Sequence, residues 1–115
     1  MFHHIDTIQI MNKANKSAQK AKLKAWRDGE RMKAQNLFPL ADSRLQEFFE
    51  MLEKLRAKHG CFHDIRHALH VIQAMQLAKE DADRLLDWCN QHGGYCDCEI
   101  AANTFMHWHE NRVRT

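Results

Sequence analysis

The chain has 115 residues, of which 44% are hydrophobic and 28% are charged, and its formal net charge is +2. This composition is too apolar for a wholly disordered chain, and the length suits one domain with a modest core. No apolar run approaches the roughly 20 residues that span a bilayer, and the N-terminus lacks the charged-then-apolar pattern of a signal peptide, so we expect a cytoplasmic protein without a membrane partner.

Residues 12–36 contain one glycine and no proline and are rich in alanine and lysine, which predicts a long helix. Six cations recur every three or four residues along this helix. They form one basic stripe, made of Lys13, Lys16, Lys20, Lys24, Arg27 and Arg31.

The charge of the chain is strongly divided. Residues 11–36 carry eight positive and two negative side chains, a net of +6, whereas residues 37–115 carry nine positive and twelve negative ones, a net of −3. Such a division favours an arm that binds an acidic partner, which is nucleic acid, a ribonucleoprotein or an acidic protein surface. The alternative is a solvated helix face that folds back on the acidic part of the chain.

A change of segment is expected at Pro39, because proline cannot continue a helix and restricts the residue before it. We therefore divide the chain into residues 1–36, an N-terminal tail with the basic helix, and residues 37–115, a helical domain. Asp42 or Ser43 is expected to cap the next helix, which ends at Gly60. Its apolar stripe consists of Leu45, Phe48, Phe49, Leu52 and Leu55.

Three further short helices are predicted after Gly60. Asp64 caps the first, whose inner face is Ile65, Ala68, Leu69, Ile72 and Met75 or Gln76. The second starts at Glu80 or Asp81 and carries Leu85, Leu86 and Cys89 inward. The third has Glu99 in its first turn and Ile100, Phe105 and Trp108 on its inner face, with His107 and His109 on the surface. The predicted fold class is therefore all-α, with about four short helices from Leu40 onward after a long basic helix.

Two pairs of soft metal ligands lie outside the predicted helix interiors, and in each pair the ligands are one residue apart. In extended backbone such residues face the same side, whereas on a helix they lie about 200° apart. Brought together, the pairs offer three thiolates and one imidazole, the donor set of a closed tetrahedral zinc site with one zinc per chain. The predicted ligands are Cys61, His63, Cys96 and Cys98.

Two other potential metal ligands, Cys89 and His67, are not included in this predicted set. Cys89 falls in the middle of a helical pattern and is expected to be a buried packing residue. His67 lies four residues after His63, a spacing that allows chelation, but a polar surface histidine is the commoner outcome for such a residue.

A zinc site filled by four protein ligands has no open position for substrate, so we do not expect an enzyme. The favoured function is a zinc-stabilised binding module that engages its partner through the basic helix, such as a regulator or inhibitor of a larger machine. One alternative is a thiol-based redox or metal sensor. The other is a zinc hydrolase or deaminase-like enzyme with Glu99 or Asp64 as proton shuttle, although the Cys-x-x-Cys and His-x-Glu spacings of deaminases are missing.

Three sequence features together resemble a small, mostly bacterial family of domains of unknown function. They are Pro39-Leu40, Cys61-x-His63 and the run Gly93-Gly94-Tyr95-Cys96-Asp97-Cys98-Glu99, which we call the cysteine box. The resemblance covers about residues 11–103, and Phe62 stands where the family usually has aspartate. It implies that Cys61, His63, Cys96 and Cys98 act as one cluster, and it implies no activity.

Overall fold

The computed structural model describes residues 2–112, with side chains from Lys16 onward. Over that range the chain is all-α, as predicted, and contains no strand. It divides into two compact units, one ending at Ala34 and the other starting at Gln35, two residues before the predicted division. Within the described part of the chain, no helix combines the length and the hydropathy that a membrane crossing requires.

Helix α1 (Phe2–Asn36) contains every described residue of the first unit, and its last two residues belong to the second unit. It begins ten residues before the predicted start at 12, and its predicted end at Asn36 is confirmed. None of its side chains from Lys16 to Asn36 is buried. The helix therefore owes its conformation to alanine, lysine and other strong helix formers rather than to a packed face.

Helix α2 (Asp42–His59) follows the break at Pro39 and ends at Gly60, both as predicted. Four residues of the predicted stripe are buried, namely Leu45, Phe48, Phe49 and Leu52. The fifth, Leu55, is partly buried. The predicted cap is wrong, because Ala41 occupies the N-cap and no side chain caps the helix. The Asp42 carboxylate instead accepts a hydrogen bond from Nε1 of Trp108 at 2.9 Å.

Helix α3 (Arg66–Ala74) presents His67, Ala68, Val71 and Ile72 to the interior. The prediction for Ala68 and Ile72 is confirmed, but Leu69 is 49% exposed and its predicted inward position is wrong. The buried residues recur as adjacent pairs four apart, which leaves Leu69 on the flank of the helix.

Helix α4 (Lys79–Gln91) starts one residue before the predicted Glu80 and buries Leu85, Trp88 and Cys89. The last described helix, which we call the final helix, is continuous and is composed of α5 (Asp97–Glu99), the π-helical segment η1 (Ile100–Thr104) and α6 (Phe105–Asn111). Together with α2 and α3, these give the four short helices expected from Leu40 onward. Ile100 and Trp108 are buried as predicted, and Phe105 is partly buried.

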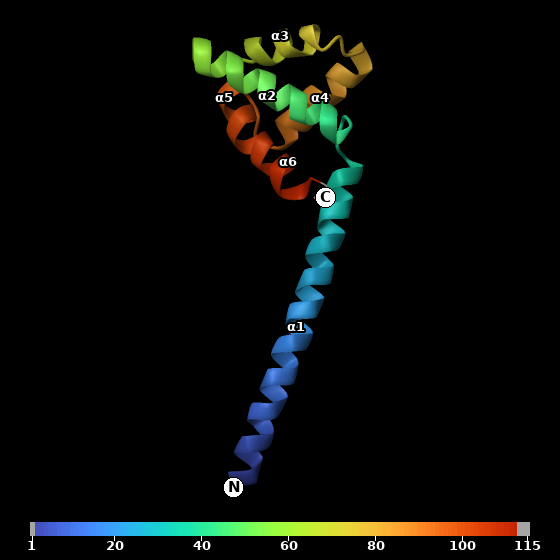
Figure 1. Cartoon of the computed structure of the whole chain (residues 1–115), viewed down its shortest axis with the longest axis vertical. Coiled ribbons are helices and arrows are strands. Elements are labelled where there is room, and N and C mark those ends of the chain that lie inside the picture. The colour runs from blue at the N-terminus through green and yellow to red at the C-terminus, as the bar shows by residue number, and fades with distance from the viewer. Residues whose placement is uncertain (1, 113–115) are drawn as a thin grey trace. The chain divides into compact units, whose positions relative to one another are not determined.

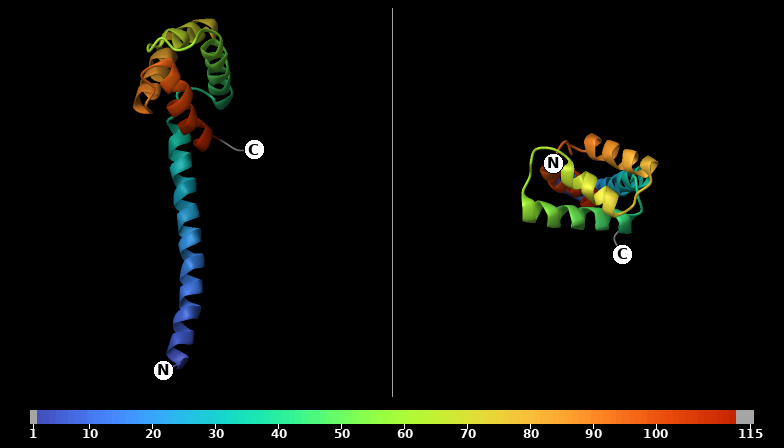
Figure 2. Two further views of the ribbon diagram at one scale, coloured as in Figure 1. Left: turned by 90° about the vertical axis from the view of Figure 1, so that its left-hand side faces the viewer. Right: turned by 90° about the horizontal axis from the view of Figure 1, so that it is seen from above.

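Within the second unit, α2 packs against both α3 and the final helix (Figure 1). Seen along two further directions, α2 and α4 occupy opposite sides of the unit (Figure 2). The ring of Phe49 is central to the core, with centroids 5.3 Å from Phe48, 5.5 Å from Phe105, 5.2 Å from Trp108 and 6.2 Å from Trp88. This core fixes the C-terminal end of α2 next to α5, which is where the two predicted ligand pairs occur.

Candidate functional site

Three cysteines from two segments of the chain gather where α2 ends and α5 begins. The Sγ atoms of Cys61 and Cys96 are 3.9 Å apart, although the two residues are separated by 35 positions in sequence. The Cys98 thiol also interacts with Cys61. Cys96 is buried, whereas Cys61 and Cys98 are partly exposed. The fold thus brings together the three predicted sulfur ligands, which we call the thiol cluster.

His63 is placed differently from the three cysteines. Its backbone N–H donates to Sγ of Cys61 at 3.4 Å, but its side chain is exposed, and no hydrogen bond described for the thiols involves its imidazole. Its φ angle is +61°, in the left-handed region that non-glycine residues seldom adopt. Such a conformation costs on the order of 1–3 kcal/mol and is concentrated at functional sites.

The thiol cluster suits zinc in its donor chemistry but does not form a complete coordination shell. Among the side chains from Lys16 to Arg112, no three His, Cys, Asp or Glu residues are arranged as a ready metal-binding group. Two sulfurs bound to one tetrahedral zinc at about 2.3 Å each lie roughly 3.8 Å apart. The 3.9 Å between Cys61 and Cys96 is close to that separation.

The three thiols differ in their readiness to ionise. The hydrogen bond from the Cys98 thiol, followed by the one from the His63 backbone, lowers the pKa of Cys61. The same contact with Cys61, together with burial, raises the pKa of Cys98. Burial raises the pKa of Cys89 to about 12, which agrees with its predicted role as a packing residue inside α4. The backbone hydrogen bond with Glu99 lowers the pKa of Cys96, but burial and the contact with Cys61 outweigh it, so this pKa is also raised. Cys61 is therefore the thiol of the cluster whose pKa is lowered.

Asp97, between the two cysteines of the cysteine box, caps a helix that lies far from it in sequence. Its side chain is fully buried and accepts hydrogen bonds from the backbone N–H groups of His67 and Ala68, both at 3.0 Å. These groups lie in the first turn of α3, where backbone donors have no partner within the helix and where the dipole favours negative charge. The N–H of Asp97 in turn donates to the carbonyl oxygen of Asp64 at 2.9 Å. One carboxylate thus fastens the cysteine box to the start of α3.

The glycines of the cysteine box are explained by the backbone and by packing. Gly93 has a φ of +76°, and a Cβ on Gly94 would lie 2.5 Å from Oγ1 of Thr104 and 2.7 Å from Cγ1 of Ile100. The Thr104 hydroxyl donates to the carbonyl oxygen of Cys89 at 3.3 Å, at the C-terminal end of α4. The glycines therefore allow η1 to approach α4 closely and so position Cys96.

Two histidine predictions are wrong. His67 is buried rather than on the surface, with Nε2 2.9 Å from the carbonyl oxygen of Gly60 and its ring stacked on that of His59. His107 is half-buried and stacks on His92, with ring centroids 3.6 Å apart. The helical pattern alone did not reveal either set of contacts. His109 is exposed, as predicted.

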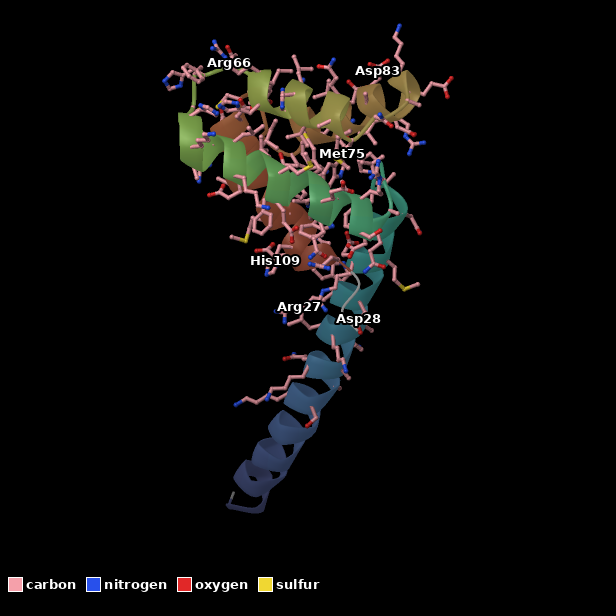
Figure 3. All side chains as sticks on the ribbon, turned by 45° about the horizontal axis from the view of Figure 1, so that its top comes forward. Arg27, Asp28, Arg66, Met75, Asp83 and His109 are labelled. Atoms are coloured by element: carbon pink, nitrogen blue, oxygen red, sulfur yellow. The ribbon has the colours of Figure 1, made fainter. Side chains whose placement is uncertain are left out.

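The basic stripe lies on the first unit. Lys16, Lys20, Lys24 and Arg27 are exposed, and Lys13 lies outside the described side chains. Arg31 approaches Asp28, with Nη1 4.0 Å from Oδ1. Arg27 and Asp28 both project from the surface of α1 (Figure 3). A shallow, open hollow of about 370 Å³ runs along the stripe and is lined by Lys20, Leu23, Lys24, Arg27, Asp28 and Arg31.

The family match found by comparison with known proteins lies within the second unit and does not include the basic helix. Residues 48–103 match the profile of a family described as "Protein of unknown function (DUF2695)". Uncharacterized proteins of Mycobacterium bovis and Mycobacterium tuberculosis are 28% identical to the chain over 79 residues, which is 69% of this chain and 77% of theirs. No solved structure matches significantly. The comparisons support a bacterial domain family of unknown function, while the motifs assigned to that family stay predictions.

Proposed function

We propose that the protein is a zinc-braced binding module whose basic helix engages nucleic acid, either free or within a ribonucleoprotein. The observation that carries this proposal is the row of exposed cations on α1, with Lys16, Lys20, Lys24 and Arg27 on one side of the helix. The surrounding residues 11–36 have a net charge of +6, while the rest of the chain from residue 37 has a net charge of −3. The cationic surface is thus concentrated on one helix.

The geometry of the stripe suits a phosphate backbone. At about 1.5 Å of rise per residue, the four cations span roughly 16 Å of helix axis. Phosphates recur roughly every 3.4 Å along one strand of a duplex, so several of them lie within reach of such a stripe. Lysine and arginine in this arrangement provide affinity without reading sequence. A partner recognised by charge is therefore expected.

The proposed brace is a zinc ion held by Cys61, Cys96, Cys98 and His63. Support comes from the thiol cluster and from the 3.9 Å between two of its sulfurs. For the fourth ligand, the exposed imidazole of His63 has to turn toward the cysteines. A structural zinc supplies on the order of 10 kcal/mol of folding free energy and, with four protein ligands, leaves no site for a catalytic water. Its role would be to hold the loop after α2 against α5.

The nucleic-acid part is tested by titrating fluorescently labelled RNA and DNA with the full chain at several salt concentrations. We expect the double variant Lys20→Gln/Lys24→Gln to bind more weakly and to flatten the log–log salt dependence by about two, since each neutralised phosphate contributes a slope of roughly 0.9. The matched control is Lys22→Gln/Lys33→Gln, which removes two positive charges from the same helix away from the stripe. Lys33 already pairs with Glu30 at 3.3 Å.

The outcome separates the possible partners. A complex that copurifies with the wild-type chain, survives nuclease treatment and contains one acidic protein would replace nucleic acid as the partner. If both double variants bind nucleic acid and protein as the wild type does, the stripe is only a solvated helix face.

A further inference from the structure

We propose that Cys61 and Cys96 form a reversible disulfide under peroxide, so that the thiol cluster is also an oxidation switch for the brace. This inference rests on the proposed zinc site and adds its regulation. The Sγ atoms of Cys61 and Cys96 are in contact, at 3.9 Å. A disulfide bond is about 2.05 Å long, so the sulfurs have to approach each other by roughly 1.9 Å.

Both cysteines lie outside the helix interiors. Cys61 lies in the segment between α2 and α3, and Cys96 has an extended conformation, with φ −143° and ψ 171°, immediately before α5. Neither side chain is held inside a helix, so rotation about χ1 moves both sulfurs. Cys98 lies within α5, and Cys89 is 1% exposed within α4. The 3.9 Å contact and the positions of both residues outside the helix interiors favour Cys61 and Cys96 among the four cysteines.

The chemistry balances with a hydroperoxide as the oxidant. One cysteine sulfur attacks the peroxide oxygen, the O–O bond breaks, and the products are a sulfenic acid and water or an alcohol. The second thiol then attacks the sulfenic sulfur, the S–S bond forms, and water leaves with the remaining proton. Overall, two thiols lose two electrons and two protons, and the peroxide is reduced. A small thiol reverses the reaction by thiol–disulfide exchange.

Oxidation would exchange one cross-link for another. A disulfide no longer offers the two thiolates on which the zinc set depends, so Cys98 and His63 would remain as two ligands. The disulfide would still join the segment after α2 to the segment before α5. The cap from Asp97 to the backbone of His67 and Ala68 lies next to this link. We therefore expect zinc to leave while α3 keeps its cap.

The test treats the zinc-loaded full chain with hydrogen peroxide and follows disulfide formation by peptide mapping and zinc release with a chromophoric chelator. The expected result is a Cys61–Cys96 cross-linked peptide lighter by two hydrogens, released zinc, and retained hydrogen-exchange protection at His67 and Ala68. Reduction and added zinc should restore the starting state. Cys89→Ser is the matched control and should behave as the wild type, whereas Cys61→Ser should give no such peptide.

Other results would separately contradict the choice of disulfide partners, the zinc site or the retained cap of α3. A disulfide that joins Cys98 to either partner, or sulfinic acid without a disulfide, would overturn this inference while zinc binding stands. A Cys61–Cys96 disulfide in a chain that never binds zinc would confirm the thiol pair and overturn the brace. Loss of amide protection on oxidation would contradict the exchange of cross-links. The mapping uses wild-type protein, so its result does not depend on whether any variant folds.

Discussion

The two units of this chain form helices for different reasons. In α1, no described side chain is buried, and large apolar residues such as Trp26 and Met32 are each 64% exposed. From Gln35 onward, by contrast, α2, α3, α4 and the final helix close around one core. Helix propensity and charge account for the first unit, and burial accounts for the second. Equivalent substitutions in the two units should therefore have different effects.

Two tryptophans provide the widest contrast. Trp108 is 2% exposed, packs on Phe49 and donates to Asp42, whereas Trp26 is 64% exposed on α1. We expect Trp108→Ala to lower the free energy of unfolding by about 3–5 kcal/mol. Trp26→Ala should change it by no more than about 0.5 kcal/mol. Chemical denaturation followed by circular dichroism measures both, and equal losses would contradict the division into a packed and an unpacked unit.

Two glycines should respond to alanine with opposite signs. The Cβ of Gly94→Ala would meet Thr104, Ile100 and the carbonyl oxygen of Cys89 at 2.5–2.9 Å, so we expect a loss of about 3 kcal/mol. Gly29 is in α1 with nothing within 4 Å of an added Cβ. Gly29→Ala should therefore raise the stability of that helix by about 0.5–1 kcal/mol. Helicity and denaturation midpoints check the two signs, and a tolerated alanine at 94 would show that η1 does not need its close approach to α4.

A buried carboxylate is compared with an exposed one in the third prediction. Asp97→Ala removes the acceptor for two N–H groups of α3 and should cost about 2 kcal/mol of unfolding free energy. Hydrogen exchange should increase specifically at His67 and Ala68, whose backbone N–H groups donate to the Asp97 carboxylate. Asp87→Ala, at an exposed position of α4, is the control and should have little effect. Unchanged exchange at the start of α3 would rule out the capping role.

The smallest expected effect concerns pH. Burial lowers the pKa of both stacked histidines, His92 and His107, and the proximity of His92 lowers that of His107 further, while Glu110 opposes the shift. The unfolded chain therefore takes up protons first as the pH falls through about 6.5 and below, so stability decreases toward acid. His107→Gln should flatten this decrease between pH 7 and about 5, whereas His70→Gln, an exposed position on α3, should retain it. An unchanged slope in His107→Gln would remove the stacked pair from this explanation.

Much of the fold could be predicted because apolar spacing is a local signal. The stripe of α2, the break at Pro39 and the buried Cys89 are all confirmed. Leu69 was placed wrongly because a nine-residue helix offers too few turns to fix the phase of its inner face. His107 was missed because its partner, His92, lies just after the C-terminal end of α4, on a separate segment of the chain.

The candidate site shows the same limit. Ligand spacing within each pair indicated that Cys61, Cys96 and Cys98 would meet, and the fold brings their sulfurs together. The role of Asp97 could not be predicted, because a cap supplied by a residue 30 positions away has no local sequence signature. The structure uses this carboxylate to hold the start of α3.

The metal content of the purified full chain tests the central claim most directly. We predict about one zinc per chain in the wild type and in Cys89→Ser, and loss of that zinc in Cys96→Ser, because Cys96 belongs to the thiol cluster and Cys89 is buried inside α4. A metal-free wild-type chain that folds with full stability would contradict the account. So would a Cys89→Ser variant that loses zinc as completely as Cys96→Ser.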